Sequence, residues 1–117
     1  MSDSNPILPA SQPPAPPVEP PKLEPVAVLS ALGSEVRWPI IKMLADGRVM
    51  SVGQIAAALG RDIDGIGRQM KVMFAAGVVE ADLGKDRRQI VYQIPAASRQ
   101  VAGVLDFGFC VIDLKKV

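Results

Sequence analysis

The chain has 117 residues and a mass of 12.4 kDa, which is the size of one domain. It has 13 Lys and Arg against 12 Asp and Glu, no histidine and one cysteine. The commonest general base is therefore missing, and neither an internal disulfide nor a multi-cysteine metal site can form. No apolar run approaches the roughly 20 residues of a membrane helix, and the N-terminus lacks the pattern of a signal peptide. We expect a cytoplasmic protein that is not an enzyme and has no cofactor or metal.

Proline divides the chain into two parts. Nine of the 11 prolines fall within residues 1–25, which predicts an extended tail that does not pack and a folding unit over residues 26–117. Without the tail, 12 basic and 9 acidic residues remain, for a net charge of +3. Residues 17–22 have the spacing of a peptide ligand for domains that bind proline-rich segments. The alternative is a solvated spacer, because a tail this rich in proline produces such matches by chance.

Two helices are predicted at the start of the folding unit. Apolar residues at helical spacing predict a helix over 26–32 that ends at Gly33. Ser34 is a good N-cap for a second helix that reaches about residue 45. Pro39 removes a backbone donor inside this second helix. We therefore expect a kink there, or a helix whose regular part starts near Pro39.

A helix-turn-helix and a hairpin follow. Ser51 caps a predicted helix over 52–59, which Gly60 ends, and Asp62 caps another through about residue 76, which Gly77 ends. Residues 49–50 could form a very short strand. Residues 78–82 and 89–94 are strand-like and are joined by a turn at 84–88. The fold class is mainly α with a small β-hairpin wing, a winged helix-turn-helix. The second of these helices has an apolar stripe of Ile63, Ile66, Met70, Met73 and Phe74.

These residues resemble the arsenical-repressor (ArsR-like) class of bacterial transcriptional regulators. The matching stretches are 31–37, 40–44, 51–60, 68–73 and 75–79, and the family pattern runs through them without a gap. Leu59-Gly60 and Ala76-Gly77 end two helices 17 residues apart, which is moderately specific as a pair. The resemblance implies a nucleoid-associated regulator that binds double-stranded DNA as a homodimer. It would use a recognition helix at about 62–76 and a basic wing at about 83–89.

Two features depart from the family pattern. The positions of the family's paired metal-binding cysteines hold Ser51 and Gly53, and the histidines of its other metal site are absent, so metal sensing is not expected. The recognition helix carries Gly65 and Gly67, which offer no side chain to a base edge and cost roughly 1 kcal/mol each in helix propensity. Direct base reading should therefore be sparse.

The candidate DNA-binding residues are mostly polar or basic. Arg68 is the best candidate for a base contact, and Asp64 could accept a hydrogen bond from a cytosine amine. The cluster of Lys85, Arg87 and Arg88 predicts phosphate contacts by the wing, although a solvated hairpin tip is the alternative. The full set is Ser51, Gln54, Arg61, Asp64, Arg68, Gln69, Lys71, Lys85, Arg87 and Arg88.

The C-terminal segment alternates apolar and other residues, which predicts a terminal strand rather than a helix. A strand this apolar should cover the core of its own domain or pair across a dimer. Cys110 is interpreted as a buried small hydrophobe, with a redox role as the alternative. We expect a homodimer interface formed by Val26, Val28, Leu29, Leu32, Leu105, Phe107 and Phe109.

A second function fits the same fold. The glycines of the recognition helix, the modest charge of +3 and the proline-rich tail would suit a winged-helix protein-interaction module that does not read DNA. DNA binding by the folded chain would discriminate between the two functions.

Overall fold

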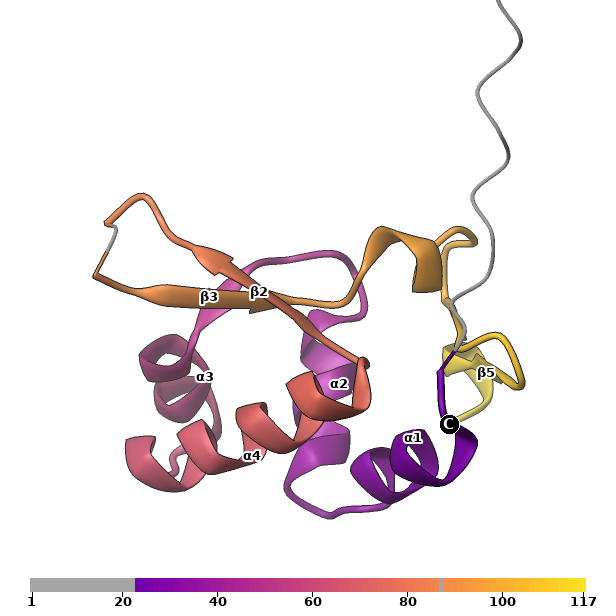
Figure 1. Ribbon diagram of the computed structural model, residues 1–117, viewed down its shortest axis with the longest axis horizontal. Helices are drawn as coiled ribbons and strands as arrows, with labels where there is room; N and C mark the ends of the chain where they lie inside the picture. Colours follow the sequence, from indigo (N-terminus) through magenta and orange to yellow (C-terminus); the bar gives the residue numbers. More distant parts are fainter. Residues whose placement is uncertain (1–22, 87) are drawn as a thin grey trace, which may run out of the picture.

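The computed structural model describes residues 23–86 and 88–117. Four α-helices and two small antiparallel sheets form the domain, which confirms the predicted winged helix-turn-helix (Figure 1). None of the described helices is both long and apolar enough to cross a membrane. In chain order the elements are α1 (Pro25–Leu32), α2 (Arg37–Leu44), β1 (Met50–Ser51), α3 (Val52–Leu59), α4 (Ile63–Ala76), β2 (Glu80–Leu83), β3 (Ile90–Gln93), the 3₁₀ turn η1 (Ala96–Ser98), β4 (Val104–Asp106), β5 (Val111–Asp113) and the 3₁₀ turn η2 (Leu114–Lys116).

Local signals set the ends of α3 and α4. The Ser51 hydroxyl accepts a hydrogen bond from the Gln54 amide, and the Gln54 side chain accepts one from the Ser51 amide, which is a capping box. The Asp62 carboxylate accepts from the Gly65 amide at 2.9 Å. Gly60 and Gly77 end the two helices in the left-handed conformation, with φ of 63° and 81°. The predicted helix-turn-helix boundaries are therefore confirmed.

The start of α2 agrees with the second of the two predicted alternatives, a helix whose regular part starts near Pro39. The Ser34 hydroxyl accepts from the amides of Val36 and Arg37, both at 3.2 Å, but the residues after Ser34 form a turn and α2 begins at Arg37. Pro39 is then the third residue of the helix. An amide in the first turn has no partner within the helix, so proline is tolerated there.

The wing is the hairpin of β2 and β3. The three-stranded sheet has the order β1-β3-β2, and both pairings are antiparallel. Leu83 pairs with Ile90 at the outer end of the hairpin, and Met50 of β1 pairs with Tyr92 of β3. The sheet thus attaches the wing to the residues that lead into α3, and the hairpin projects from the domain beyond α3 (Figure 1).

The core joins α1, α2, α3 and α4 to the end of the chain. Val28 and Ala31 of α1, Ile40 and Ile41 of α2 and Ile55 of α3 are buried in one cluster with Met70 and Met73 of α4 and with Leu105 and Phe107. Leu23 is partly buried against this cluster, so packing begins two residues before α1. The rest of the predicted proline-rich tail, residues 1–22, lies outside the described residues.

The C-terminal prediction is corrected in part. The segment forms two short strands, β4 and β5, that pair as a hairpin instead of one continuous strand. Gly108 lies in the connecting turn with φ of 91°. Leu105 and Phe107, before the turn, are buried, whereas Phe109 and Val111, after the start of the turn, are exposed.

Much of the predicted dimer interface is internal to one chain. Val28, Leu32, Leu105 and Phe107 are all in the core cluster. Val26, Leu29 and Phe109 remain on the surface. The correction follows from helix geometry, because residues 28 and 32 share one face of α1 and turn inward together.

Candidate nucleic-acid interface

Helix α4 presents two unpaired cations to solvent. Arg68 and Lys71 are exposed, and neither has an ion-pair partner among the described residues. Arg61, just before α4, is also exposed and unpaired within residues 23–86 and 88–117. Asp64 is exposed in the first turn of the helix, where its charge suits the helix dipole but opposes a phosphate. The outer side of α4 therefore carries a net positive charge.

The tip of the wing carries further cations. Lys85 is exposed and has no ion-pair partner in the described chain. The Arg88 Nε lies 3.2 Å from the Asp86 Oδ1, and the Arg88 side chain is 91% exposed. A pair this exposed contributes little and can exchange partners. Arg87, the third predicted wing cation, lies outside the described residues.

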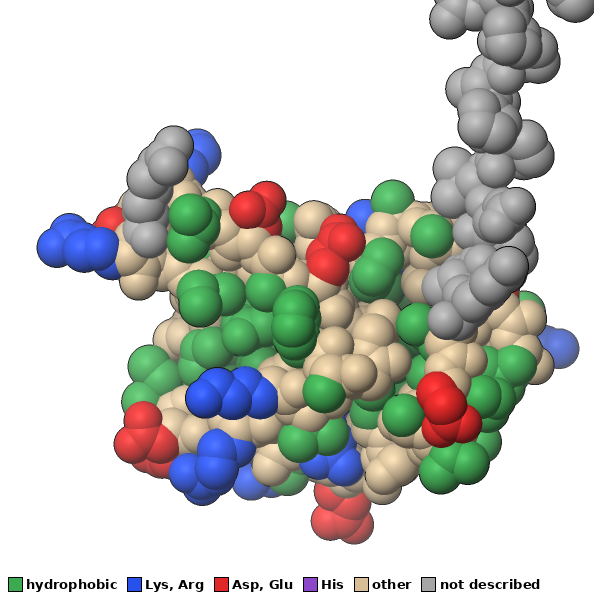
Figure 2. Space-filling view, in the orientation of Figure 1, with side chains coloured by type: hydrophobic (Ala, Val, Ile, Leu, Met, Phe, Trp, Pro, Cys, Tyr) green, Lys and Arg blue, Asp and Glu red, His purple; other side chains and the backbone are tan. Residues whose placement is uncertain are grey.

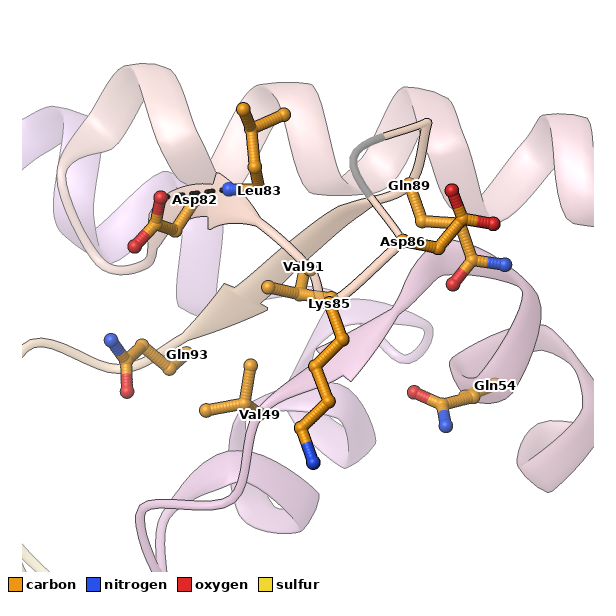
Figure 3. Close-up of a pocket in the computed structure, with 10 residues that line it drawn as sticks. Val49, Gln54, Asp82, Leu83, Lys85, Asp86, Gln89, Val91 and Gln93 are labelled. Carbon is orange, nitrogen blue, oxygen red and sulfur yellow. Dashed lines mark hydrogen bonds between the residues drawn. The ribbon is translucent and has the colours of Figure 1, made fainter.

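A hollow lies between the wing and the start of α3. It has a volume of about 630 Å³ and is lined by Val49, Gln54, Lys85 and residues of β2 and β3 (Figure 3). Gln54 is exposed, but its side-chain oxygen is held by the Ser51 amide. Ser51 itself is 7% exposed, and its hydroxyl faces the Gln54 amide. Its predicted role as a phosphate donor is therefore corrected to that of a helix cap.

Gln69 occupies a different environment from its neighbour Arg68. Its side-chain oxygen accepts a hydrogen bond from Arg37 Nη1 at 2.6 Å, and the residue is half-buried. The same guanidinium donates through Nε to the Ala31 carbonyl at 2.8 Å. The structure thus gives Gln69 a role in joining α2 to α4.

A groove lies between α4 and the wing, and the sequence did not predict it. It has a volume of about 400 Å³. Figure 2 shows hydrophobic side chains gathered between the wing and α4, with Lys and Arg side chains at the wing tip and along α4. Its lining residues are Ser51, Val52 and Gly53 from the start of α3, Ile63, Gly67 and Lys71 from α4, and Arg88, Gln89, Ile90 and Tyr92 from the wing.

Two members of the predicted apolar stripe of α4 explain why the groove was missed. Ile66, Met70 and Met73 are buried as expected, but Ile63 and Phe74 are 54% and 53% exposed. Helical periodicity identifies one apolar side of α4. How much of that side is buried depends on where the wing packs. The apolar stripe was the available sequence signal for this groove, because an apolar residue at the edge of such a stripe is a candidate for contact with a partner.

Cys110 is a free cysteine and is partly buried. Burial, and secondly the charge of Asp106, raises the pKa of the Cys110 thiol. Nowhere in the described ranges do three His, Cys, Asp or Glu side chains gather as a metal site would require. The face formed by α4 and the wing is thus suited to binding through charge and apolar contact.

Comparison with known proteins places this geometry among regulators. The sequence model of the HVO_A0114 family matches residues 33–96. No protein among the curated sequences matches the chain. The structure is similar to that of the homodimeric winged helix-turn-helix DNA-binding domain of Mb0332 from Mycobacterium bovis, a possible ArsR-family transcriptional regulator. The two share 28% identity with a TM-score of 0.53, over 59% of this chain and 61% of that one.

Two further solved structures show the same likeness. An ArsR-like transcriptional regulator from Rhodococcus sp. RHA1 is 28% identical, with a TM-score of 0.54, over 62% of this chain and 65% of that one. The transcriptional repressor BigR from Xylella fastidiosa is 26% identical, with a TM-score of 0.53, over 64% of this chain and 74% of that one. The resemblance to ArsR-like regulators is therefore confirmed, and these neighbours are regulators, not enzymes.

Proposed function

Because the chain belongs to the HVO_A0114 family and is similar in structure to ArsR-like regulators, we propose that it is a transcriptional regulator that binds duplex DNA as a homodimer. The recognition helix is α4, and the wing is the β2–β3 hairpin. The observation that carries the proposal is the set of exposed cations on these two elements, Arg68 and Lys71 on α4 and Lys85 and Arg88 on the wing.

The charges favour contacts to phosphate over a dense set of base contacts. Each cation that neutralises a phosphate releases counterions, so the affinity falls steeply as salt rises. Asp64 and Asp86 offset part of the positive charge, which predicts modest non-specific binding. The wing reaches the sugar-phosphate backbone while the first half of α4 enters a major groove about 12 Å wide.

The proposed homodimer uses the apolar surface that one chain leaves uncovered. Val26 and Leu29 of α1 are 72% and 56% exposed, and Phe109 and Val111 of the C-terminal hairpin are also exposed. Two copies joined at these residues would present two copies of α4. Their half-sites would lie about one helical turn apart, near 34 Å. Sedimentation of the full chain at tens of micromolar tests this, and a monomer there would contradict the dimer.

Fluorescence anisotropy of the full chain with a random-sequence duplex, titrated at several salt concentrations, tests DNA binding. A slope of about −0.9 in log affinity against log salt for each neutralised phosphate is expected. The variant Arg87→Glu/Arg88→Glu should abolish most of this binding. The matched control is Lys115→Glu/Lys116→Glu, which makes the same change of charge at the C-terminal end, far from the wing (Figure 1).

The protein-interaction module remains the second candidate, because exposed apolar side chains lie on the wing and on α4. Leu83 and Ile90 form a cross-strand pair and are 53% and 51% exposed. A folded chain that fails to bind duplex DNA at about 50 mM salt, where phosphate contacts are strong, would replace the DNA proposal with this one.

A further inference from the structure

Gly67 lies in the interior of α4, where no contact within the described residues requires the absence of a side chain. A Cβ at this position would meet only the Val52 Cγ1, at 3.9 Å, which is an ordinary van der Waals contact. Gly67 is not among the residues with positive φ, so the helical backbone and its surroundings would accept alanine. Glycine is the poorest helix former after proline. The glycine at position 67 is therefore explained by something outside the described chain.

The surroundings of Gly67 describe what could lie against it. Ile63 and Lys71 lie one turn before and one turn after it, so the three residues share one side of α4 and line the same groove. Ile90 lines the groove from the wing. Ile63 and Ile90 are 54% and 51% exposed, so both offer apolar surface to a partner.

Cations border this apolar groove on both elements. Lys71 of α4 and Arg88 of the wing are among its lining residues, and both are exposed. An occupant that fits has negative charge at its margins and a small apolar group between them. The major-groove edge of a T·A base pair has this character, because the thymine C5-methyl projects between two phosphate backbones.

We propose that the groove formed by Ile63, Gly67 and Ile90 receives the C5-methyl group of thymine, so that the protein reads methylated pyrimidine edges by apolar contact. This inference rests on the proposed DNA binding and deepens it. Gly67 lets the base edge approach the helix backbone, and the two isoleucines enclose the methyl. The scarcity of polar side chains at the start of α4 follows, since apolar contact replaces hydrogen bonds in the reading of the base.

The test compares duplexes that differ only in this methyl group. Affinity of the full chain is measured for an alternating dA·dT duplex and for the same duplex with deoxyuridine in place of thymidine. We expect tighter binding to the thymine duplex, by about fourfold for each methyl buried, which corresponds to the transfer of one apolar carbon. An alternating dG·dC duplex with 5-methylcytosine should bind more tightly than its unmethylated form by a similar factor.

Variants separate methyl reading from phosphate binding. Ile63→Ala and Ile90→Ala should bring the ratio of the two affinities close to one. Lys71→Ala is the control, since it should weaken binding to both duplexes equally. Gly67→Ala is the most informative variant. It should raise the melting temperature of the free protein and lower the ratio of the affinity for the thymine duplex to that for the uracil duplex. Higher stability with weaker binding is not expected of a residue that serves packing alone.

The outcomes distinguish the two levels of the proposal. No binding to any duplex would overturn the proposed function together with this inference. Binding with equal affinity for thymine and uracil duplexes would overturn the methyl pocket and leave DNA binding intact. If Ile63→Ala changed only the sedimentation of the free chain, the methyl pocket would be wrong and the groove would belong to a second copy.

Discussion

Arg37 Nη1 donates a hydrogen bond to the side-chain oxygen of Gln69 at 2.6 Å, across 32 residues of sequence. The guanidinium also donates to the carbonyls of Ala31 and Ser30 at the end of α1, at 2.8 and 3.2 Å. One side chain at the start of α2 therefore satisfies carbonyls at the end of α1 and holds α4 in place. Gln69 therefore helps to fix the position of α4 relative to α2.

Removing this connection should destabilise the fold. We expect Arg37→Met to lower the free energy of unfolding by about 1.5–3 kcal/mol, the range for hydrogen bonds made by a charged group. Gln69→Ala should lower it by less, because two of the three hydrogen bonds remain. Urea denaturation measures both. Arg68→Ala, next to Gln69 and exposed, is the control and should change stability by less than about 0.5 kcal/mol.

The two phenylalanines of the C-terminal hairpin should behave oppositely. Phe107 is fully buried, so Phe107→Ala should cost about 3–5 kcal/mol through lost apolar contact and a cavity. Phe109 is 40% exposed, so Phe109→Ala should have little effect on the stability of one chain. It should instead weaken self-association, which sedimentation measures. An equal loss of stability in the two variants would show that Phe109 is as buried as Phe107, which would contradict the structure.

Ser51 should act as a helix cap. Ser51→Ala removes the acceptor for the Gln54 amide and should cost about 1 kcal/mol in urea denaturation. DNA affinity should be unchanged under conditions where the variant is folded. A loss of affinity without a loss of stability would return Ser51 to the DNA interface.

The Cys110 thiol should react slowly. Burial and the charge of Asp106 raise its pKa, so the thiolate that attacks disulfide reagents is a small fraction near neutral pH. The rate of modification should increase in denaturant, where both causes disappear. Asp106→Asn should increase it modestly in the folded protein. A folded thiol that reacts faster than the denatured one would support the redox role.

Asp46 should titrate at unusually low pH. The Arg48 side chain donates hydrogen bonds to its carboxylate, one of them at 2.8 Å, and this lowers the pKa from 3.8 to about 2. Because the pKa is lower in the folded state, the stabilising effect is present above about pH 3.8 and is lost as pH falls toward 2. Carboxyl NMR resonances give the midpoint. In Arg48→Ala it should move back toward 3.8, and an unchanged midpoint would exclude Arg48 as the cause.

The helix-turn-helix could be predicted from the sequence because its boundaries depend on single residues. Ser51 and Asp62 begin α3 and α4, and Gly60 and Gly77 end them, through hydrogen bonds or backbone angles within a few residues. Such signals act locally and do not require the rest of the fold. The basic wing was predictable for the same reason, since a polar turn between two apolar runs favours a hairpin.

Tertiary structure alone decided which apolar and polar side chains face solvent. Ile63 and Ile66 belong to the same predicted stripe, yet only Ile66 is covered, and Phe107 is buried where Phe109 is not. Gln69 is half-buried against Arg37, whereas its neighbour Arg68 faces solvent. Periodicity identifies a side of an element, whereas burial depends on segments that are distant in sequence. The sequence by itself therefore determined the elements and their ends, and the packing of α4 against the wing and α2 determined the groove at Gly67.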